Sequence, residues 1–311
     1  MAGIAREGGS KSEQNGRGSS WRSPNERRLL PYLFIAPNLI VFIAFMFIPI
    51  LFALYVSLTQ WTLIGASQFI GFDNYVTMLG EGQFWQALRN TAVYTLGVVP
   101  TSMVLGLAAA VLLNRKLPVR TFLRSVYFMP VVISGVAVAL IGEWMFNDQY
   151  GIINAVLTKL GLGAVNWLSS GTWAMVALII TTMWTRIGFC MVLYLASLQS
   201  IPETYYDAAR VDGASGWARF RFITLPLLAP TTFLVLIIQV ILSFRVFDLV
   251  YVMTGGGPGF STTVLVQYIY EEAFTNQDMG YASAVGVVLY LILMVFTLIQ
   301  WRISRQGEAG Q

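Results

Sequence analysis

Residues 203–226 read ETYYDAARVDGASGWARFRFITLP, and they form a polar stretch between two long apolar runs. The runs on either side, near 172–197 and 227–253, are each long enough to cross a bilayer, which takes about 20 apolar residues. Backbone polar groups in lipid must pair within their own segment, so both runs are expected to be helices. The polar stretch is therefore a loop that leaves the membrane and returns to it on the same side.

The first half of this loop predicts a short helix. Ser200 and Glu203 have the Ser-x-x-Glu spacing of a capping box, and Pro202 between them suits a first helical turn. The helix is expected to run from Glu203 to Val211. Asp212-Gly213 should end it, because glycine readily adopts a positive φ.

The second half predicts another short helix. Ser215 can cap it, and it should run through Phe222 before Leu225-Pro226 closes it ahead of the next span. The loop also holds several small side chains, so another protein surface can approach it closely. We therefore expect two short helices at an angle, which form a compact projection from the membrane.

The composition indicates a membrane protein. The chain has 311 residues, of which 56% are hydrophobic and 11% are charged, whereas soluble domains carry about 25% charged residues. Six segments are apolar and long enough to span a bilayer, near 32–58, 91–113, 122–146, 172–197, 227–253 and 282–303. The predicted fold is an all-α, polytopic membrane domain over 31–304, with the polar loop at 198–226. Five prolines should mark kinks or helix ends: Pro37, Pro49, Pro100, Pro130 and Pro230.

The basic residues predict the orientation. Fifteen of the 19 lie in the N-terminal tail, the 114–124 connection, the 203–226 loop and the C-terminal end, and only Arg89 and Lys159 lie on the other side. The positive-inside rule then places both termini and the 203–226 loop in the cytoplasm. Residues 1–30, rich in Gly, Ser, Arg and Asn, should be a disordered cytoplasmic tail, and 305–311 a cytoplasmic C-terminal tail. This clustering explains the basic pI without a nucleic-acid partner.

Catalytic and metal chemistry are not expected of this chain. It contains no histidine and one cysteine, Cys190, which lies in an apolar run. It also lacks a Gly-rich phosphate loop ending in Lys-Ser/Thr. We therefore expect no catalytic residues, no metal site, no cofactor and no enzyme activity.

The 203–226 loop resembles the EAA loop of binding-protein-dependent ABC importers. Asp207-Ala208-Ala209, Gly213, Ile223 and Leu225-Pro226 have the spacing of that loop, with Asp207 in place of its glutamate. The resemblance implies a cytoplasmic coupling helix pair on which an ATP-hydrolysing subunit docks. It assigns that coupling role to Glu203, Asp207, Ala208, Ala209, Asp212, Gly213 and Ala214.

Further motifs are similar to the carbohydrate-uptake branch of these permeases, including the maltose permease. They are GFDNY at 71–75, Asn90-Thr91, YVMTGGGP at 251–258 and GYASA at 280–284. The resemblance implies a multi-pass protein of a bacterial or archaeal inner membrane that carries a sugar or oligosaccharide. The implied partners are a second permease subunit, an ABC ATPase dimer that binds the ATP, an extracytoplasmic solute-binding protein and membrane lipid.

Polar and aromatic residues inside the spans are candidates for the solute pathway, because polar groups in lipid are costly. They are Trp184, Arg186, Phe189, Gln239, Ser243, Arg245, Asp248 and Tyr251. Arg245 and Asp248 are three apart and should share a helix face. Three alternatives stay open: an ion pair that only supports packing, an anionic solute such as glycerol-3-phosphate or a glycerophosphodiester, and an ion-coupled secondary transporter.

Overall fold

The computed structural model describes residues 34–62, 65, 67–115 and 118–308. The chain divides into two units, Met1–Phe52 and Ala53–Gln311, which are described separately. The tail predicted to be disordered, 1–30, lies outside the described residues.

The first apolar run is a helix, Phe34–Val56, in which only 6% of the most apolar window is buried. Its middle is a π-helical turn, η1 (Ile43–Phe47), followed by α2 (Ile48–Val56). The helix confirms the predicted span at 32–58.

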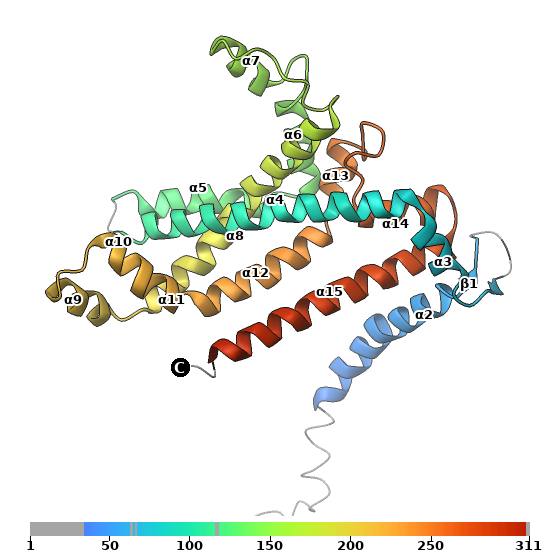
Figure 1. Ribbon diagram of the computed structural model, residues 1–311, viewed down its shortest axis with the longest axis horizontal. Coiled ribbons are helices and arrows are strands. Elements are labelled where there is room, and N and C mark those ends of the chain that lie inside the picture. Colours follow the sequence, from blue (N-terminus) through green and yellow to red (C-terminus); the bar gives the residue numbers. More distant parts are fainter. Residues whose placement is uncertain (1–33, 63–64, 66, 116–117, 309–311) are drawn as a thin grey trace, which may run out of the picture. The chain divides into compact units, whose positions relative to one another are not determined.

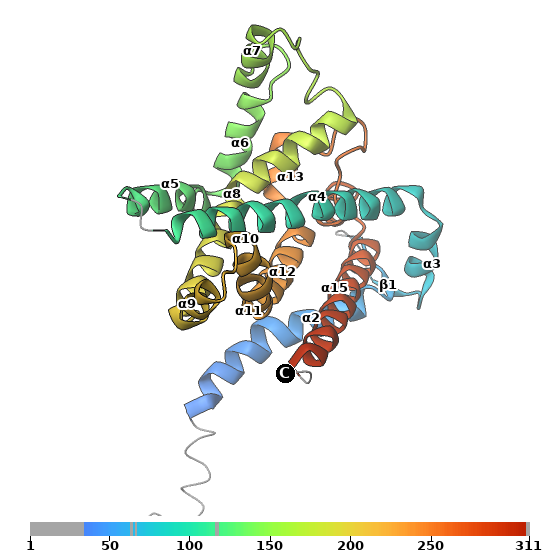
Figure 2. The same ribbon diagram turned by 60° about the vertical axis from the view of Figure 1, so that its left-hand side comes forward.

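Three helices of the second unit are long and apolar enough to cross a membrane unbroken. They are α4 (Gly82–Leu113), α8 (Gly171–Ser200) and α15 (Met279–Glu308). α4 begins well before the predicted start at residue 91, and α15 contains the predicted boundary between span and C-terminal tail. α4 and α8 lie side by side in both views (Figure 1, Figure 2).

The other two spans are broken. α5 (Arg120–Val132) and α6 (Gly135–Met145) meet at a bend of 101°. The helical stretch Gly216–Leu227 and α12 (Ala229–Phe244) meet at 64°. Among the described residues, the all-α fold has up to six spans when each bent pair counts as one. The continuous helices predicted over 122–146 and 227–253 are wrong in detail, because the first is broken at Ile133-Ser134 and the second at residues 245–247.

The predicted prolines differ in effect. Pro130 lies near the end of α5 and Pro230 in the first turn of α12, as expected, whereas α4 continues past Pro100 as one helix.

Short elements lie between the spans. They are the antiparallel pair β1 (Thr59–Gln60) and β2 (Gln68–Phe69), the helices α3 (Asp73–Gly80), α7 (Ile152–Lys159), α13 (Asp248–Met253) and α14 (Leu265–Tyr270), and the π-helical η3 (Glu271–Thr275).

Two asparagines hold these short elements to the spans. Asn74 Nδ2 donates to the carbonyls of Ser57 and Thr59, both at 2.9 Å. Asn90 Nδ2 donates to the carbonyls of Phe260 and Thr263, both at 3.0 Å. The 71–75 motif is thus hydrogen-bonded to residues 57–59 after α2, and Asn90 of α4 to the loop after residue 258.

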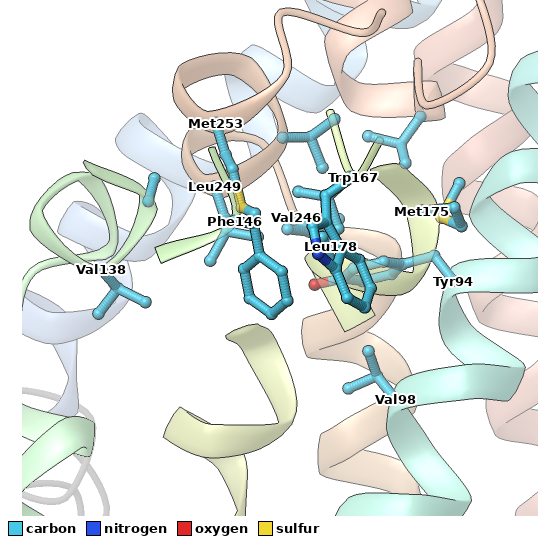
Figure 3. Close-up of a cluster of buried hydrophobic side chains, with 14 residues drawn as sticks. Tyr94, Val98, Val138, Phe146, Trp167, Met175, Leu178, Val246, Leu249 and Met253 are labelled. Atoms are coloured by element: carbon cyan, nitrogen blue, oxygen red, sulfur yellow. The ribbon is translucent and has the colours of Figure 1, made fainter. Parts of the chain in front are cut away.

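A buried cluster supports the region where the broken spans meet α4 and α8. Figure 3 shows Phe146 and Trp167 among aliphatic side chains, with Tyr94 from α4 beside them. The Phe146 and Trp167 rings pack edge to face with centroids 5.1 Å apart. Several of its residues, including Tyr94 and Val138, also line the pocket between the spans that is described below.

Candidate functional site

The polar loop folds into α9 (Glu203–Val211), α10 (Gly216–Arg219) and a π-helical turn, η2 (Phe220–Thr224). We call residues 203–224 the bent segment. In Figure 1 it lies at the end of the second unit where α4 ends and α5 begins. The first helix has the predicted bounds.

The predicted capping box is wrong. Pro202 occupies the N-cap of α9 and makes no side-chain cap. The Ser200 hydroxyl instead donates to the Ser197 carbonyl at 2.8 Å, because α8 continues to Ser200. A serine that still belongs to the preceding helix satisfies that helix's carbonyl groups and is not free to cap the next one.

The turn between the two short helices follows the prediction. Gly213 has φ +77°, and a Cβ added there would meet nothing within 4 Å, so its conformation rather than crowding requires glycine. Ser215 caps α10 by accepting a hydrogen bond from Ala218 N at 3.2 Å. The predicted end at Phe222 is wrong, since η2 leads into α11 (Leu225–Leu227).

The outer surface of the bent segment is exposed and partly apolar. No residue of α9 or α10 is buried, and Val211 is 88% exposed. Trp217 and Phe222 are 71% and 75% exposed. Large apolar side chains gathered at a polar helix pair are typical of a protein-binding surface.

All seven predicted coupling residues lie in this segment. Asp207 pairs with Arg210 at 2.7 Å within α9, so its carboxylate is held near the surface. Ala208 is exposed, and Ala209 O accepts from Ala214 N at 2.8 Å across the turn. Glu203, Asp212 and Gly213 are also exposed. Five of the seven residues are therefore exposed, and Ala209 and Ala214 are partly exposed at the turn.

A second candidate site is a pocket of about 300 Å³ between the spans, which we call the interspan pocket. It lies where α5 gives way to α6 and where α12 gives way to α13, beside α8. Broken helices expose backbone polar groups at membrane depth, which is typical of solute sites in transport proteins.

Three of the eight predicted pathway residues line this pocket: Arg186, Phe189 and Asp248. Arg186 and Phe189 come from α8, and Asp248 begins α13. The Asp248 carboxylate packs directly against Gly135, where a side chain would collide with it. Glycine at the start of α6 is thus what admits the carboxylate.

The ion pair that was left open as an alternative is not formed between Arg245 and Asp248. Arg245 is the C-cap of α12, whereas Asp248 starts a separate helix, so the two do not share a helix face. Among the described residues, neither of them nor Arg186 forms an ion pair.

The other predicted pathway residues lie outside the pocket. Gln239 is buried and donates from Nε2 to Cys190 Sγ at 2.8 Å, and Ser243 is also buried. Trp184 is exposed. Tyr251 packs against Phe247 and Tyr270 with centroids 5.1 and 5.4 Å away.

Sequence reasoning missed three polar residues of the pocket: Tyr94, Thr182 and Thr185. The Tyr94 hydroxyl and Thr182 Oγ1 are hydrogen-bonded at 2.8 Å. Thr182, Thr185, Arg186 and Phe189 follow the spacing of one helix face, a signal that would have identified the two threonines. No comparable spacing of polar residues marks Tyr94 in the sequence.

Comparisons with known proteins identify the family of the chain. Residues 102–306 match the family described as "binding-protein-dependent transport system inner membrane component". The chain is 38% identical over 287 residues to a sulfoquinovosyl glycerol transport system permease of Agrobacterium fabrum, covering 90% of this chain and 92% of that protein.

Two further similarities extend this result. A trehalose/maltose transport system permease of Thermococcus litoralis is 36% identical over 277 residues, with 89% and 94% of the two chains covered. In structure, the chain is similar to a chain of a bacterial alginate ABC transporter solved with an alginate pentasaccharide-bound periplasmic protein. The TM-score is 0.80 at 26% identity, covering 90% of this chain and 96% of that chain.

Proposed function

The chain belongs to the family of binding-protein-dependent transport system inner membrane components, and from this membership we propose that it forms one half of the transmembrane pathway of a sugar or oligosaccharide importer. It is an importer permease subunit and not an enzyme. The observation that carries the proposal is the pairing of an exposed, partly apolar helix pair with a polar pocket at two helix breaks.

The proposed partners follow from the two sites. A second permease subunit completes the pathway, an ABC ATPase dimer binds the ATP and docks on the bent segment, and an extracytoplasmic binding protein delivers the solute. Both termini and the bent segment face the cytoplasm, as the distribution of basic residues favours.

The proposed mechanism is rigid-body alternating access. Closure of the ATPase dimer on ATP draws the bent segments of the two permease subunits together. α8 continues from the interspan pocket to Ser200, close to the start of α9, so a shift of the segment reaches the pocket through one helix. The pathway then opens outward to receive solute, and ATP hydrolysis restores the inward-facing state.

The interspan pocket suits a hydroxyl-rich ring. Arg186 offers donors, and Phe189 offers an apolar face. Asp248 offers acceptors, as does the Thr185 hydroxyl, whose own proton is donated to the Thr182 carbonyl at 2.8 Å. Sugars combine polar edges with apolar faces, so a mixed wall of this kind recognises them. The carbohydrates named for the related proteins support this assignment.

An anionic solute is the second candidate. Arg186 lines the pocket without an ion pair in the described part of the chain, so its guanidinium is available to a carboxylate, phosphate or sulfonate. The family membership, by contrast, argues against an ion-coupled secondary transporter.

Arg186→Ala tests the pathway. We expect uptake by vesicles containing the assembled importer to fall about tenfold or more, because a buried charge-assisted hydrogen bond contributes about 1.5–3 kcal/mol. The labelled solutes tested for uptake are neutral oligosaccharides, a uronate oligosaccharide and glycerol-3-phosphate. The matched control is Arg89→Ala, at an exposed position of α4 outside the pocket.

Assembly is measured in the same vesicles by co-purification of the partner subunits. Loss of uptake in the Arg186 variant with intact assembly supports the pathway role. A stronger effect on the acidic solutes selects the anionic candidate. Normal uptake of every solute by the Arg186 variant would remove the pocket from the pathway.

A further inference from the structure

A larger pocket lies behind the bent segment, away from the interspan pocket. Its volume is about 550 Å³, and the two pockets share no lining residue. Its walls come from the C-terminal ends of α4 and α8 and from α9, α10 and η2. Because three arginines line it, we call it the basic pocket. It has the size of a small-molecule site.

The charges in this pocket are unbalanced. Its arginines are Arg115, Arg210 and Arg219, and Glu203 is the one acidic residue in its lining. Arg210 is paired with Asp207 at 2.7 Å. In the part of the chain that the structure describes, Arg115 and Arg219 form neither an ion pair nor a side-chain hydrogen bond.

Arg219 is placed to hold a ligand. It is only partly exposed, and one of its Nη atoms lies 4.0 Å from the position of a Cβ on Gly216, another lining residue. The glycine therefore leaves open the space in front of the guanidinium group. A guanidinium group in a concave site binds anions. A phosphate can accept two parallel N–H hydrogen bonds from it.

The rest of the lining fits a hydroxylated group attached to that phosphate. Tyr206 and Thr224 contribute hydroxyls that are hydrogen-bonded to each other at 3.0 Å. Asn114 contributes an amide, and Glu203 can accept hydrogen bonds from ligand hydroxyls. A bare inorganic anion would leave most of the volume and these groups unused.

We propose that the basic pocket binds a phosphate ester that carries a hydroxylated group, with Arg115 and Arg219 holding the phosphate. Two sources share this chemistry: the headgroup of an anionic lipid such as phosphatidylglycerol, and a free sugar phosphate. The site lies on the side that the basic residues assign to the cytoplasm, where anionic headgroups are abundant. The proposal does not depend on which solute the pathway carries.

Binding is tested on the full chain, purified with the subunits that accompany it, in nanodiscs of phosphatidylcholine. The midpoint of thermal unfolding is measured with glucose 6-phosphate, with inorganic phosphate, and with phosphatidylglycerol added to the nanodisc. A ligand that binds only the folded protein raises the midpoint, and the rise grows with the logarithm of the ligand concentration above its dissociation constant. A rise with phosphatidylglycerol alone identifies the lipid source, and a rise with glucose 6-phosphate identifies the soluble source.

The variants are Arg115→Gln combined with Arg219→Gln, and Gly216→Glu. The first removes both guanidinium groups, and we expect the affinity to fall about tenfold or more. The second keeps every arginine but places a carboxylate beside Arg219, in the first turn of α10 where acidic residues are favourable. The Gly216 variant keeps the proposal testable if the double variant does not fold. Arg120→Gln, at an exposed position outside the pocket, is the control.

The expected result is a midpoint shift in the wild type and the control that is lost in the Arg115/Arg219 double variant and in the Gly216 variant. No shift with any of the three probes in the wild type would overturn the proposal. An equal shift in the wild type and in both pocket variants would overturn it as well.

Discussion

Glycine residues set how closely the spans of the second unit pack. A Cβ on Gly188 of α8 would overlap the Tyr127 carbonyl in α5. A Cβ on Gly106 of α4 would overlap the Cys190 side chain of α8. Small residues at such crossings allow helix backbones to approach each other, which is a main source of packing energy in membranes. These glycines therefore stabilise the walls of the interspan pocket.

Gly188→Ala tests this packing. The new methyl group would meet backbone that cannot rotate away, so we expect destabilisation of about 1–3 kcal/mol. Gly286→Ala is the control, because Gly286 lies in α15, where an added Cβ would meet nothing within 4 Å. Thermal unfolding in detergent distinguishes the two. Equal melting midpoints would show that the α5–α8 contact is not close.

Asp148 organises the connection between α6 and α8. Leu168 N and Ser169 N donate to its carboxylate at 2.9 and 3.0 Å, and the Ser169 hydroxyl donates as well. Partial burial raises the pKa of Asp148, but these hydrogen bonds outweigh it, so the pKa lies below the ordinary value. The carboxylate is therefore more favourable in the folded connection than in the unfolded chain.

This shift predicts a pH dependence. A lowered pKa stabilises the connection at any pH above the ordinary carboxyl range, and the stabilisation is lost as the pH falls through the folded-state value. The protection factors of the Leu168 and Ser169 amides, which are measured relative to the intrinsic exchange rate at each pH, should therefore fall on acidification in the wild type. In Asp148→Asn they should be low at neutral pH already and change little with acid. Unchanged protection in that variant would contradict the assignment.

Some residues of the interspan pocket could be identified from the sequence because charge in an apolar run is conspicuous. Arg186 and Asp248 were found that way, and both line the interspan pocket. Arg245 carried the same signal but caps a helix end instead. Tyr94 could not be found, because a tyrosine in an apolar run gives no indication of which way its hydroxyl points.

At the scale of elements, two π-helical turns come just before a proline. η1 precedes Pro49, and η2 precedes Pro226. In an α-helix the proline ring would clash with the carbonyl four residues earlier, and in both cases that carbonyl belongs to the wider turn. The wider turn lets each helix continue, which is why the predicted end at Phe222 was wrong.

Two serines near the bent segment should behave differently. Ser215→Ala removes the cap of α10, and we expect a cost of about 1 kcal/mol because Ala218 N loses its acceptor. Ser200→Ala should leave α9 unchanged, since Ser200 does not cap it. Hydrogen exchange of amides 203–219 is the measurement. Slower amide exchange in the Ser215 variant than in the Ser200 variant would contradict the structure.

The breaks in the spans could not be predicted from hydropathy. A window of about 20 residues averages over the bend at Ile133-Ser134 and over residues 245–247 between α12 and α13. The local signal was present in part, because Ser134 accepts from Ala137 N as an N-cap of α6. The bend angle itself depends on packing against α8 and α13, which no local pattern encodes.

At the scale of the whole molecule, the chain joins two sites through α8. The interspan pocket lies along its middle, and the bent segment begins just after its end. The number of spans and the presence of the bent segment followed from apolar runs and turn residues. The pocket did not, because it forms where segments distant in sequence meet.

We infer that the bent segment is the docking site for an ATPase on the cytoplasmic side. The sequence contains one cysteine, Cys190, which is buried, so a single introduced cysteine can be labelled selectively. The most direct measurement is site-specific labelling and cross-linking of Val211→Cys in sealed vesicles, with Leu160→Cys as the control. Val211 is 88% exposed and Leu160 68% exposed.

We predict that a membrane-impermeant maleimide reaches position 211 only from the cytoplasmic face and position 160 only from the opposite face. A short bifunctional reagent should join position 211, but not position 160, to the ATPase subunit. Labelling of position 211 from the outer face, or an intact, ATP-driven importer in which position 211 never cross-links to the ATPase, would contradict the claim.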